Sequence, residues 1–222
     1  MSNDSKTTRI TEPAAIESRS MEIINEELRA RGARFASDNR ELVILRRVIH
    51  TTADFDFADN LTFVNSATDA GVSALAQGSP IVTDTNMAKA GISRPALVRL
   101  GSSAHCFVAD PDVAEAAREA QTTRAVMAMR KALRLHPDAI LAVGNAPTAL
   151  FELCEHLRAG AQPALVIAVP VGFVNVVEAK EETLALCKEL GVPAIVARGR
   201  KGGSTVATAI ANALLYEATR TK

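Results

Sequence analysis

The chain has 222 residues, with 25 Lys and Arg residues against 25 Asp and Glu residues, so its formal net charge at pH 7 is zero. Hydrophobic residues make up 48% of the chain, which is enough for a sizeable core. The neutral balance, the lack of Trp and the single Tyr argue against a nucleic-acid binder, which presents basic patches and stacking aromatic rings. No apolar run approaches the ~20 residues needed to span a bilayer, so no membrane segment is expected.

The cysteines and histidines indicate neither cross-links nor metal. Cys106, Cys154 and Cys187 are widely spaced and odd in number, which fits neither a disulfide framework nor a zinc site. The four histidines lack metal-ligand spacing, so no metal site is expected. Reduced thiols and a polar N-terminus without a signal peptide predict a cytoplasmic location.

The first third of the chain is predicted to hold a polar segment and then mainly helices. Residues 1–12 are polar and are expected to be disordered, and residues 13–222 are expected to form a single domain. The spacing of apolar residues predicts helices over 13–31 and 41–49, a strand over 60–64 and a helix over 67–77.

From residue 80 onward, predicted strands and helices alternate. Strands are predicted over 80–83, 105–108, 139–143, 164–169 and 194–197, and helices over 111–135, 147–159, 176–190 and 204–219. A break at Thr122 and Thr123 is the alternative to one long helix over 111–135, and 95–100 is either a short helix or irregular. The strand segments are apolar on both faces, as in a sheet covered on both sides. The pattern predicts an α/β fold, with a mostly parallel sheet flanked by helices.

Three glycine-containing segments, 144–150, 170–174 and 199–204, each follow a predicted strand. Glycine allows positive φ or a close approach to a ligand, and helix N-termini point N–H groups into the same space. Because parallel strands end at one edge of a sheet, the three turns are expected to form one crevice for an anionic ligand. Segment 199–204 lacks Walker A spacing, and no G-x-G-x-x-G occurs, so a nucleotide is not indicated. The segment is either an oxyanion clamp or a tight turn with solvated charges.

Two side chains stand out as candidates for chemistry. His50 can act as an acid or base near neutral pH, with Asp54 as a candidate to orient it, although most isolated histidines are structural or exposed. Asp84 follows a strand and is either a helix N-cap or a ligand contact. Glu178 and Lys180 follow the segment 170–175, and their purely structural interpretation is a solvated first helical turn.

Taken together, these motifs resemble the precorrin-8X methylmutases, also called precorrin isomerases, and their cobalt-precorrin-8 counterparts. The matching segments are 47–54, 81–84 with Met87 and Gly91, 144–150, 170–174, 178–181 and 199–204, and the likeness runs from about residue 16 to residue 215. Two positions depart from the pattern. Ala179 stands where a small hydroxyl residue is expected, and Asn175 replaces a residue that is usually smaller.

The resemblance implies an isomerase of cobalamin biosynthesis that moves a methyl group from C-11 to C-12 of a corrin precursor, without a redox cofactor. It implies a corrinoid substrate and product, a homodimer, and His50 as the general acid that protonates the macrocycle. The substrate contacts that it implies are Ser20, Thr51, Asp84, Arg124, Asn145, Gly172, Lys201, Gly202 and Gly203. The alternative is a corrinoid carrier without catalysis, which would have no need of an acid at His50. A phosphate-binding α/β enzyme is disfavoured by the missing Walker A spacing.

Overall fold

The computed structural model describes residues 10–32 and 40–221, so most of the segment expected to be disordered lies outside the described residues. Its centre is a six-stranded sheet in the order β1-β6-β5-β4-β2-β3. The strands are β1 (Leu61–Val64), β2 (Ile81–Thr83), β3 (Ala104–His105), β4 (Ile140–Val143), β5 (Leu165–Ala168) and β6 (Ala194–Ala197). All neighbouring strands are parallel except β1 and β6, which confirms the predicted mostly parallel sheet.

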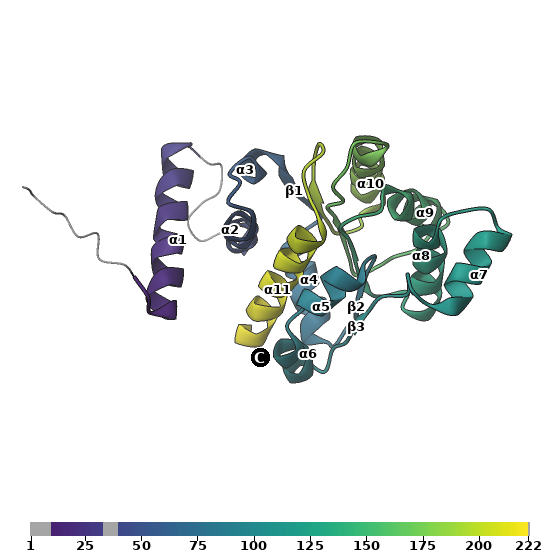
Figure 1. Cartoon of the computed structure of the whole chain (residues 1–222), viewed down its shortest axis with the longest axis horizontal. Helices are drawn as coiled ribbons and strands as arrows, with labels where there is room; N and C mark the ends of the chain where they lie inside the picture. The colour runs from purple at the N-terminus through teal and green to yellow at the C-terminus, as the bar shows by residue number, and fades with distance from the viewer. Residues whose placement is uncertain (1–9, 33–39, 222) are drawn as a thin grey trace, which may run out of the picture.

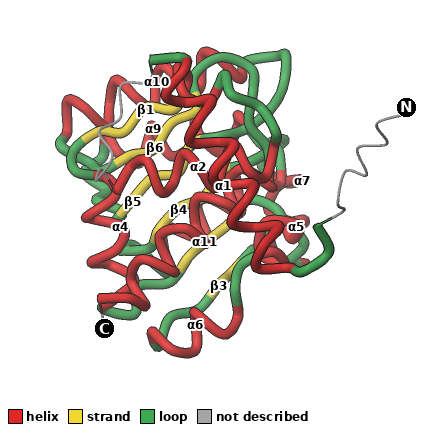
Figure 2. Tube along the Cα trace, turned by 90° about the vertical axis from the view of Figure 1, so that its left-hand side faces the viewer, coloured by secondary structure: helices red, strands yellow, loops and turns green. Residues whose placement is uncertain are grey.

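Helices cover both faces of this sheet (Figures 1 and 2). One face carries α4 (Ala67–Ala76), α11 (Ser204–Thr221) and α2 (Arg40–Thr52), with α1 (Pro13–Ala30) packed outside α2. The other face carries α8 (Arg124–Leu135), α9 (Pro147–Arg158) and α10 (Val176–Leu190), with α7 (Pro111–Glu119) packed outside α8. Three short helices complete the fold, namely α3 (Phe57–Asn60), α5 (Asn86–Gly91) and α6 (Arg94–Leu100).

The alternation of side chains along the strands divides the core into two layers. In β4, Ile140 and Ala142 belong to the cluster under α4 and α11, whereas Leu141 and Val143 belong to the cluster under α8, α9 and α10. All four residues are buried, as are those of β5 and β6. A central strand of a covered parallel sheet has to be apolar on both faces, which is why these runs were recognisable in the sequence.

Three expected elements differ in detail. The helix expected over 111–135 is two helices, which confirms the alternative of a break: Gln121 has a φ of 49°, and the hydroxyl of Thr123 accepts a hydrogen bond from the backbone N–H of Val126. The strand expected over 105–108 is reduced to Ala104–His105, because the chain turns where Asp110 N donates to Phe107 O. The helix expected to end at residue 49 continues to Thr52, which places His50 in its last turn.

Candidate functional site

The parallel strands β2, β4, β5 and β6 all end at one edge of the sheet, where the glycine turns begin. β1 runs the other way, and its first residue, Leu61, lies opposite Ala197 at the end of β6. The segment that leads from α2 into β1 therefore reaches the same edge, and Arg198 N donates to Asn60 O there. The end of α2, with His50, and the three glycine turns therefore lie at one edge of the sheet, although they come from separate parts of the sequence.

The turn at residues 199–204 fits tightly against the end of β5. Gly203 N donates to Val169 O at 2.8 Å. A Cβ at Gly202 would lie 2.1 Å from that same carbonyl oxygen, so only glycine fits there. Gly172, in the neighbouring turn, donates its N–H to Arg200 O at 3.3 Å.

The turn at Gly144 is the third glycine turn, and it contacts the turn at residues 199–204. A Cβ at Gly144 would lie 2.8 Å from Ser204 Cα, so this backbone also requires glycine. Ser204 Oγ lies 2.8 Å from Thr85 Oγ1, which caps α5 by accepting from Ala88 N. These contacts confirm that the three glycine turns meet at one edge. The link between Thr85 and Ser204 joins residues far apart in sequence and carried no signal there.

The carboxylate of Asp84 holds the turn at Gly144 by three hydrogen bonds. Its Oδ1 accepts from Gly144 N at 2.9 Å, and its Oδ2 accepts from Asn145 N and Ala146 N, both at 2.8 Å. Burial raises the pKa of this carboxyl, while the three N–H groups oppose the rise. Both oxygens are thus engaged by the protein itself. Asp84 bonds the three residues that precede α9, and Thr85 is the residue that caps the following helix, α5. These bonds give Asp84 a positioning role, and direct contact with substrate stays a prediction.

His50 is exposed in the last turn of α2, with Thr51 exposed beside it. Ala53 has a φ of 53°, a left-handed conformation that costs a non-glycine residue about 1–3 kcal/mol. The chain reverses there and carries Asp54 toward Lys201.

Lys201 joins the His50 segment to the glycine turn. Its Nζ lies 2.6 Å from Asp54 Oδ2 and 2.5 Å from Asp56 Oδ2. The bond with Lys201 lowers the pKa of Asp54, and the bond with Asp54 raises the pKa of Lys201. The suggestion that Asp54 orients His50 is wrong in this structure, because its carboxylate is bonded to Lys201 and to Asp56 N. Asp56 was missed by the sequence analysis.

Lys180 contradicts the expectation of a solvated helical turn, because its side chain is fully buried. Its Nζ donates to Gly199 O at 2.9 Å and to Lys201 O at 2.8 Å. Desolvation lowers the pKa of Lys180 to about 8. The position was readable in the sequence, since Lys180 falls on the apolar stripe of α10 with Val176, Thr183 and Cys187.

Arg124 lies at the start of α8, and Ser20 lies on the outer helix α1. Arg124 is the first residue of α8, and the preceding Thr123 hydroxyl lies 3.1 Å from Thr148 Oγ1 in the first turn of α9. Arg124 also lines a cavity of about 430 Å³ together with Arg118, Thr122, Ala114 and Ala117. Ser20 lies on α1, one turn after Glu17, which pairs with Arg47 on α2. The Ser20 hydroxyl itself donates to Ile16 O.

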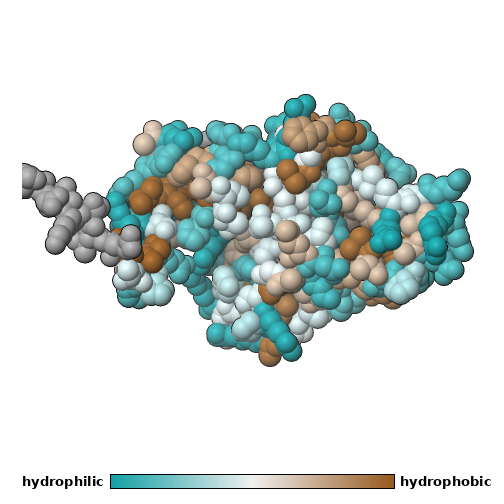
Figure 3. Space-filling model, viewed as in Figure 1, coloured by the Kyte–Doolittle hydropathy of each residue, from teal (hydrophilic) through white to brown (hydrophobic). Residues whose placement is uncertain are grey.

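Apolar side chains are exposed beside the glycine turns. Phe173 is 83% exposed and Val174 77% exposed, in the turn that precedes α10. The guanidinium of Arg200 lies 5.7 Å from the centre of the Phe173 ring. Figure 3 shows apolar surface gathered near the start of α10. The edge therefore offers exposed apolar surface beside the glycine turns.

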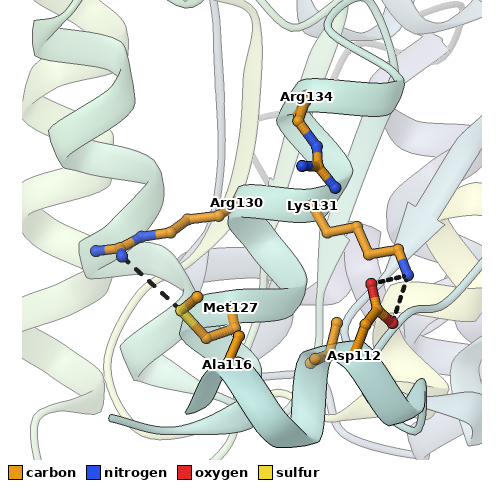
Figure 4. A pocket seen from close by; sticks show the side chains of 7 residues that line it. Asp112, Ala116, Met127, Arg130, Lys131 and Arg134 are labelled. Carbon is orange, nitrogen blue, oxygen red and sulfur yellow. Dashed lines mark hydrogen bonds and ion pairs between the residues drawn. The ribbon is translucent and has the colours of Figure 1, made fainter. Parts of the chain in front are cut away.

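A second cavity, of about 380 Å³, lies between α7 and α8 (Figure 4). Its cations are largely paired: Lys131 Nζ lies 2.7 Å from both Asp110 and Asp112, and Arg130 is bonded to Glu152. It offers little net positive charge to an anion. Across residues 10–32 and 40–221, no group of three or more His, Cys, Asp or Glu residues could hold a metal ion, and no helix is both long and apolar enough to cross a membrane.

Comparison with known proteins gives one family throughout. The family model for precorrin-8X methylmutase matches residues 15–217. The cobalt-precorrin-8 methylmutase of Leptospira interrogans is 43% identical over 205 residues, with 90% of this chain and 91% of that protein covered. The precorrin-8X methylmutase of Pseudomonas aeruginosa is 41% identical over 172 residues, with 77% and 81% covered. The crystal structure of precorrin-8X methylmutase from Thermus thermophilus aligns with a TM-score of 0.80 at 39% identity and covers 93% of this chain and 98% of that one. The chain therefore belongs to the precorrin-8X methylmutase family and is an isomerase of cobalamin biosynthesis.

Proposed function

We propose that this chain moves a methyl group from C-11 to C-12 of precorrin-8X or of cobalt-precorrin-8, giving hydrogenobyrinate or cobyrinate. The observation that carries the proposal is the meeting of His50 with the three glycine turns at one edge of the sheet, in a chain of this family. Relatives of both names occur at 41–43% identity, so the proposal covers both substrates.

The chemistry of the edge suits such a substrate. A corrin precursor has an apolar macrocycle and a fringe of acetate and propionate carboxylates. The exposed Phe173 and Val174 can pack against the apolar macrocycle, and N–H groups of the glycine turns can donate hydrogen bonds to the carboxylates. A neutral chain can still carry a locally positive crevice, since Arg200 lies in the turn after β6 and Arg124 starts α8 beside the first turn of α9.

In the proposed mechanism, His50 is the general acid. It protonates the macrocycle and so promotes migration of the methyl group, a step that is typically accelerated about 10²- to 10⁴-fold by such an acid. The remaining acceleration comes from holding the flexible ring in its reactive shape. Thr51, Asn145, Gly172, Gly202 and Gly203 are the proposed contacts that hold it, together with Ser20 and Arg124.

The test is the His50→Ala variant, assayed for turnover and for corrinoid binding in one preparation. We expect turnover to fall by about 10² or more while binding is retained. The matched control is His156→Ala on α9, where Glu152 keeps Arg130 as a partner. Turnover of His50→Ala within about tenfold of the parent contradicts the assignment.

The same variant separates the enzyme from a carrier. A corrinoid carrier would bind product equally well with either residue at position 50 and would not change the visible absorption of added precorrin-8X. The names of the relatives favour the enzyme.

We further propose that the protein acts as a homodimer in the cytoplasm. Ile16 and Ile23 on the outer helix α1 are 46% and 47% exposed, which leaves apolar surface for a second copy. The three cysteines are free and buried, as is usual in a reducing compartment. Light scattering at micromolar concentration tests the dimer, and a fully active protein with a mass near 23.5 kDa would contradict it.

A further inference from the structure

Lys180 is a buried cation that lacks a carboxylate partner. Among the described residues, no Asp or Glu oxygen lies within ion-pair distance of its ammonium, and nearby Glu181 is paired with Arg198. Burial of an unpaired charge is costly, and proteins retain such groups mainly where function needs them. Two hydrogen bonds, to Gly199 O and Lys201 O, are the contacts that hold the ammonium in place.

These two bonds fix the orientation of the turn. In a planar trans peptide the C=O of one residue and the N–H of the next point in opposite directions. Because Gly199 O and Lys201 O face Lys180, the N–H groups of Arg200 and Gly202 point away from it. Within the described part of the chain, neither N–H has a hydrogen-bond acceptor. Two free donors in one short turn are available to bind an anion.

Lys201 is unsuited to complete this site, although its sequence position suggests it. Its ammonium is already bonded to Asp54 and Asp56 and has two negative charges beside it. The charge of Lys180 is uncompensated and lies directly behind the two N–H groups.

We propose that Lys180 is a positioning residue that presents the N–H groups of Arg200 and Gly202 to one carboxylate of the corrinoid. That carboxylate supplies the counter-charge that the protein interior lacks. The inference rests on the proposed function, since it takes the ligand to be a corrinoid acid. It replaces Lys201 by Lys180 as the lysine on which binding of that carboxylate depends.

The experiment compares two probes, the corrinoid acid product and the same corrinoid with its side-chain carboxylates converted to primary amides. Dissociation constants are measured for the parent, for Lys180→Met and for Lys188→Met, a control that makes the same change at an exposed lysine of α10. Lys180→Gln is the second variant, because Gln keeps a neutral donor if Met is not accommodated.

We expect affinity for the acid to fall about 10- to 150-fold in Lys180→Met, because the two N–H donors lose their support and the carboxylate loses the charge behind them. Affinity for the amide should change by less than about threefold. Lys180→Gln should show the same selective loss, and Lys188→Met should match the parent. An equal fall for acid and amide would mean that Lys180 only supports the fold, and unchanged affinities would remove it from the site; either result overturns the inference. A parent that binds neither corrinoid would instead contradict the proposed function itself.

Discussion

Two lysines approach the turn at residues 199–204 and end in opposite electrostatic environments. Lys201 is partly exposed and lies between two carboxylates, which raises its pKa. Lys180 is buried among apolar side chains and carbonyl oxygens, which lowers its pKa to about 8. The difference follows from position alone, since both side chains have the same chemistry. Each therefore leads to a separate prediction.

The first prediction concerns the pH dependence of stability. A lysine with a pKa of about 8 in the folded state and about 10.5 in the unfolded state binds fewer protons when folded between those two values, so stability rises with pH across that window. The full effect is about 3 kcal/mol. We expect the free energy of unfolding of the parent, minus that of Lys180→Met, to increase from pH 8 to pH 10.5 in urea titrations. Subtracting the two free energies of unfolding removes the contributions of other ionisable groups. If the difference does not change with pH, Lys180 is not a buried cation.

The second prediction concerns Lys201. Lys201→Ala leaves Asp54 and Asp56 without their shared cation, and their charges then repel an anionic corrinoid. Because the three groups are partly exposed, we expect a loss of affinity of only about two- to fivefold at low salt. Adding Asp54→Asn and Asp56→Asn should restore affinity. A loss of about 10-fold or more that these changes do not repair would show that Lys201 holds a substrate carboxylate directly.

For single residues, the sequence indicates which side chains can do chemistry but not which residues they bond. His50 was recognisable because few side chains can act as an acid near neutral pH. The pairing of Asp54 with Lys201 was not, because it joins positions 147 residues apart. Lys180 lay on an apolar stripe, and the pattern alone predicts its burial, but not the carbonyl oxygens that it meets.

Among the elements, the glycine turns hold the site together by close backbone contacts. Gly202→Ala places a Cβ 2.1 Å from Val169 O, and this oxygen belongs to backbone that cannot easily move. The turn and the end of β5 must separate to accommodate it.

The third prediction is that Gly202→Ala lowers the free energy of unfolding by about 1–3 kcal/mol, the usual range for overpacking, and weakens corrinoid binding. The control is Gly172→Ala in the neighbouring turn, where an added Cβ would make only an ordinary contact at 3.7 Å from Val176. Its stability should stay within about 0.5 kcal/mol of the parent. Thermal or urea unfolding of both variants decides the point, and equal stabilities would contradict the close approach seen at Gly202.

Local signals predicted the central strands and the long helices α1, α4, α9, α10 and α11 to within about two residues at each end, and the short elements less well. The runs that form β4, β5 and β6 are apolar on both faces and were placed to within a residue at each end. The antiparallel direction of β1 was not readable, because it depends on pairing with β6, more than 130 residues later. β3 is an edge strand with pairing on one side only, so it is shorter than its apolar sequence suggested.

Across the whole molecule, topology explains why so distributed a set of residues forms one site. The four parallel strands β2, β4, β5 and β6 bring their following turns to one edge, and the reversed β1 adds the end of α2. Such an edge is the usual place for ligands in open α/β sheets. The family match over residues 15–217 identifies the chain as an isomerase, and we propose that its reaction takes place at this edge.

The most direct measurement follows the migrating methyl group itself. Precorrin-8X and cobalt-precorrin-8 that carry ¹³C both in the C-11 methyl group and at one carbon of the macrocycle are mixed with unlabelled substrate and incubated with the purified protein. The products are analysed by NMR and mass spectrometry. We expect at least one substrate to give a product with the methyl label at C-12, and we expect no singly labelled product, which would show exchange of methyl groups between molecules. Recovery of both substrates unchanged, although bound, would contradict the proposed reaction and leave a corrinoid carrier.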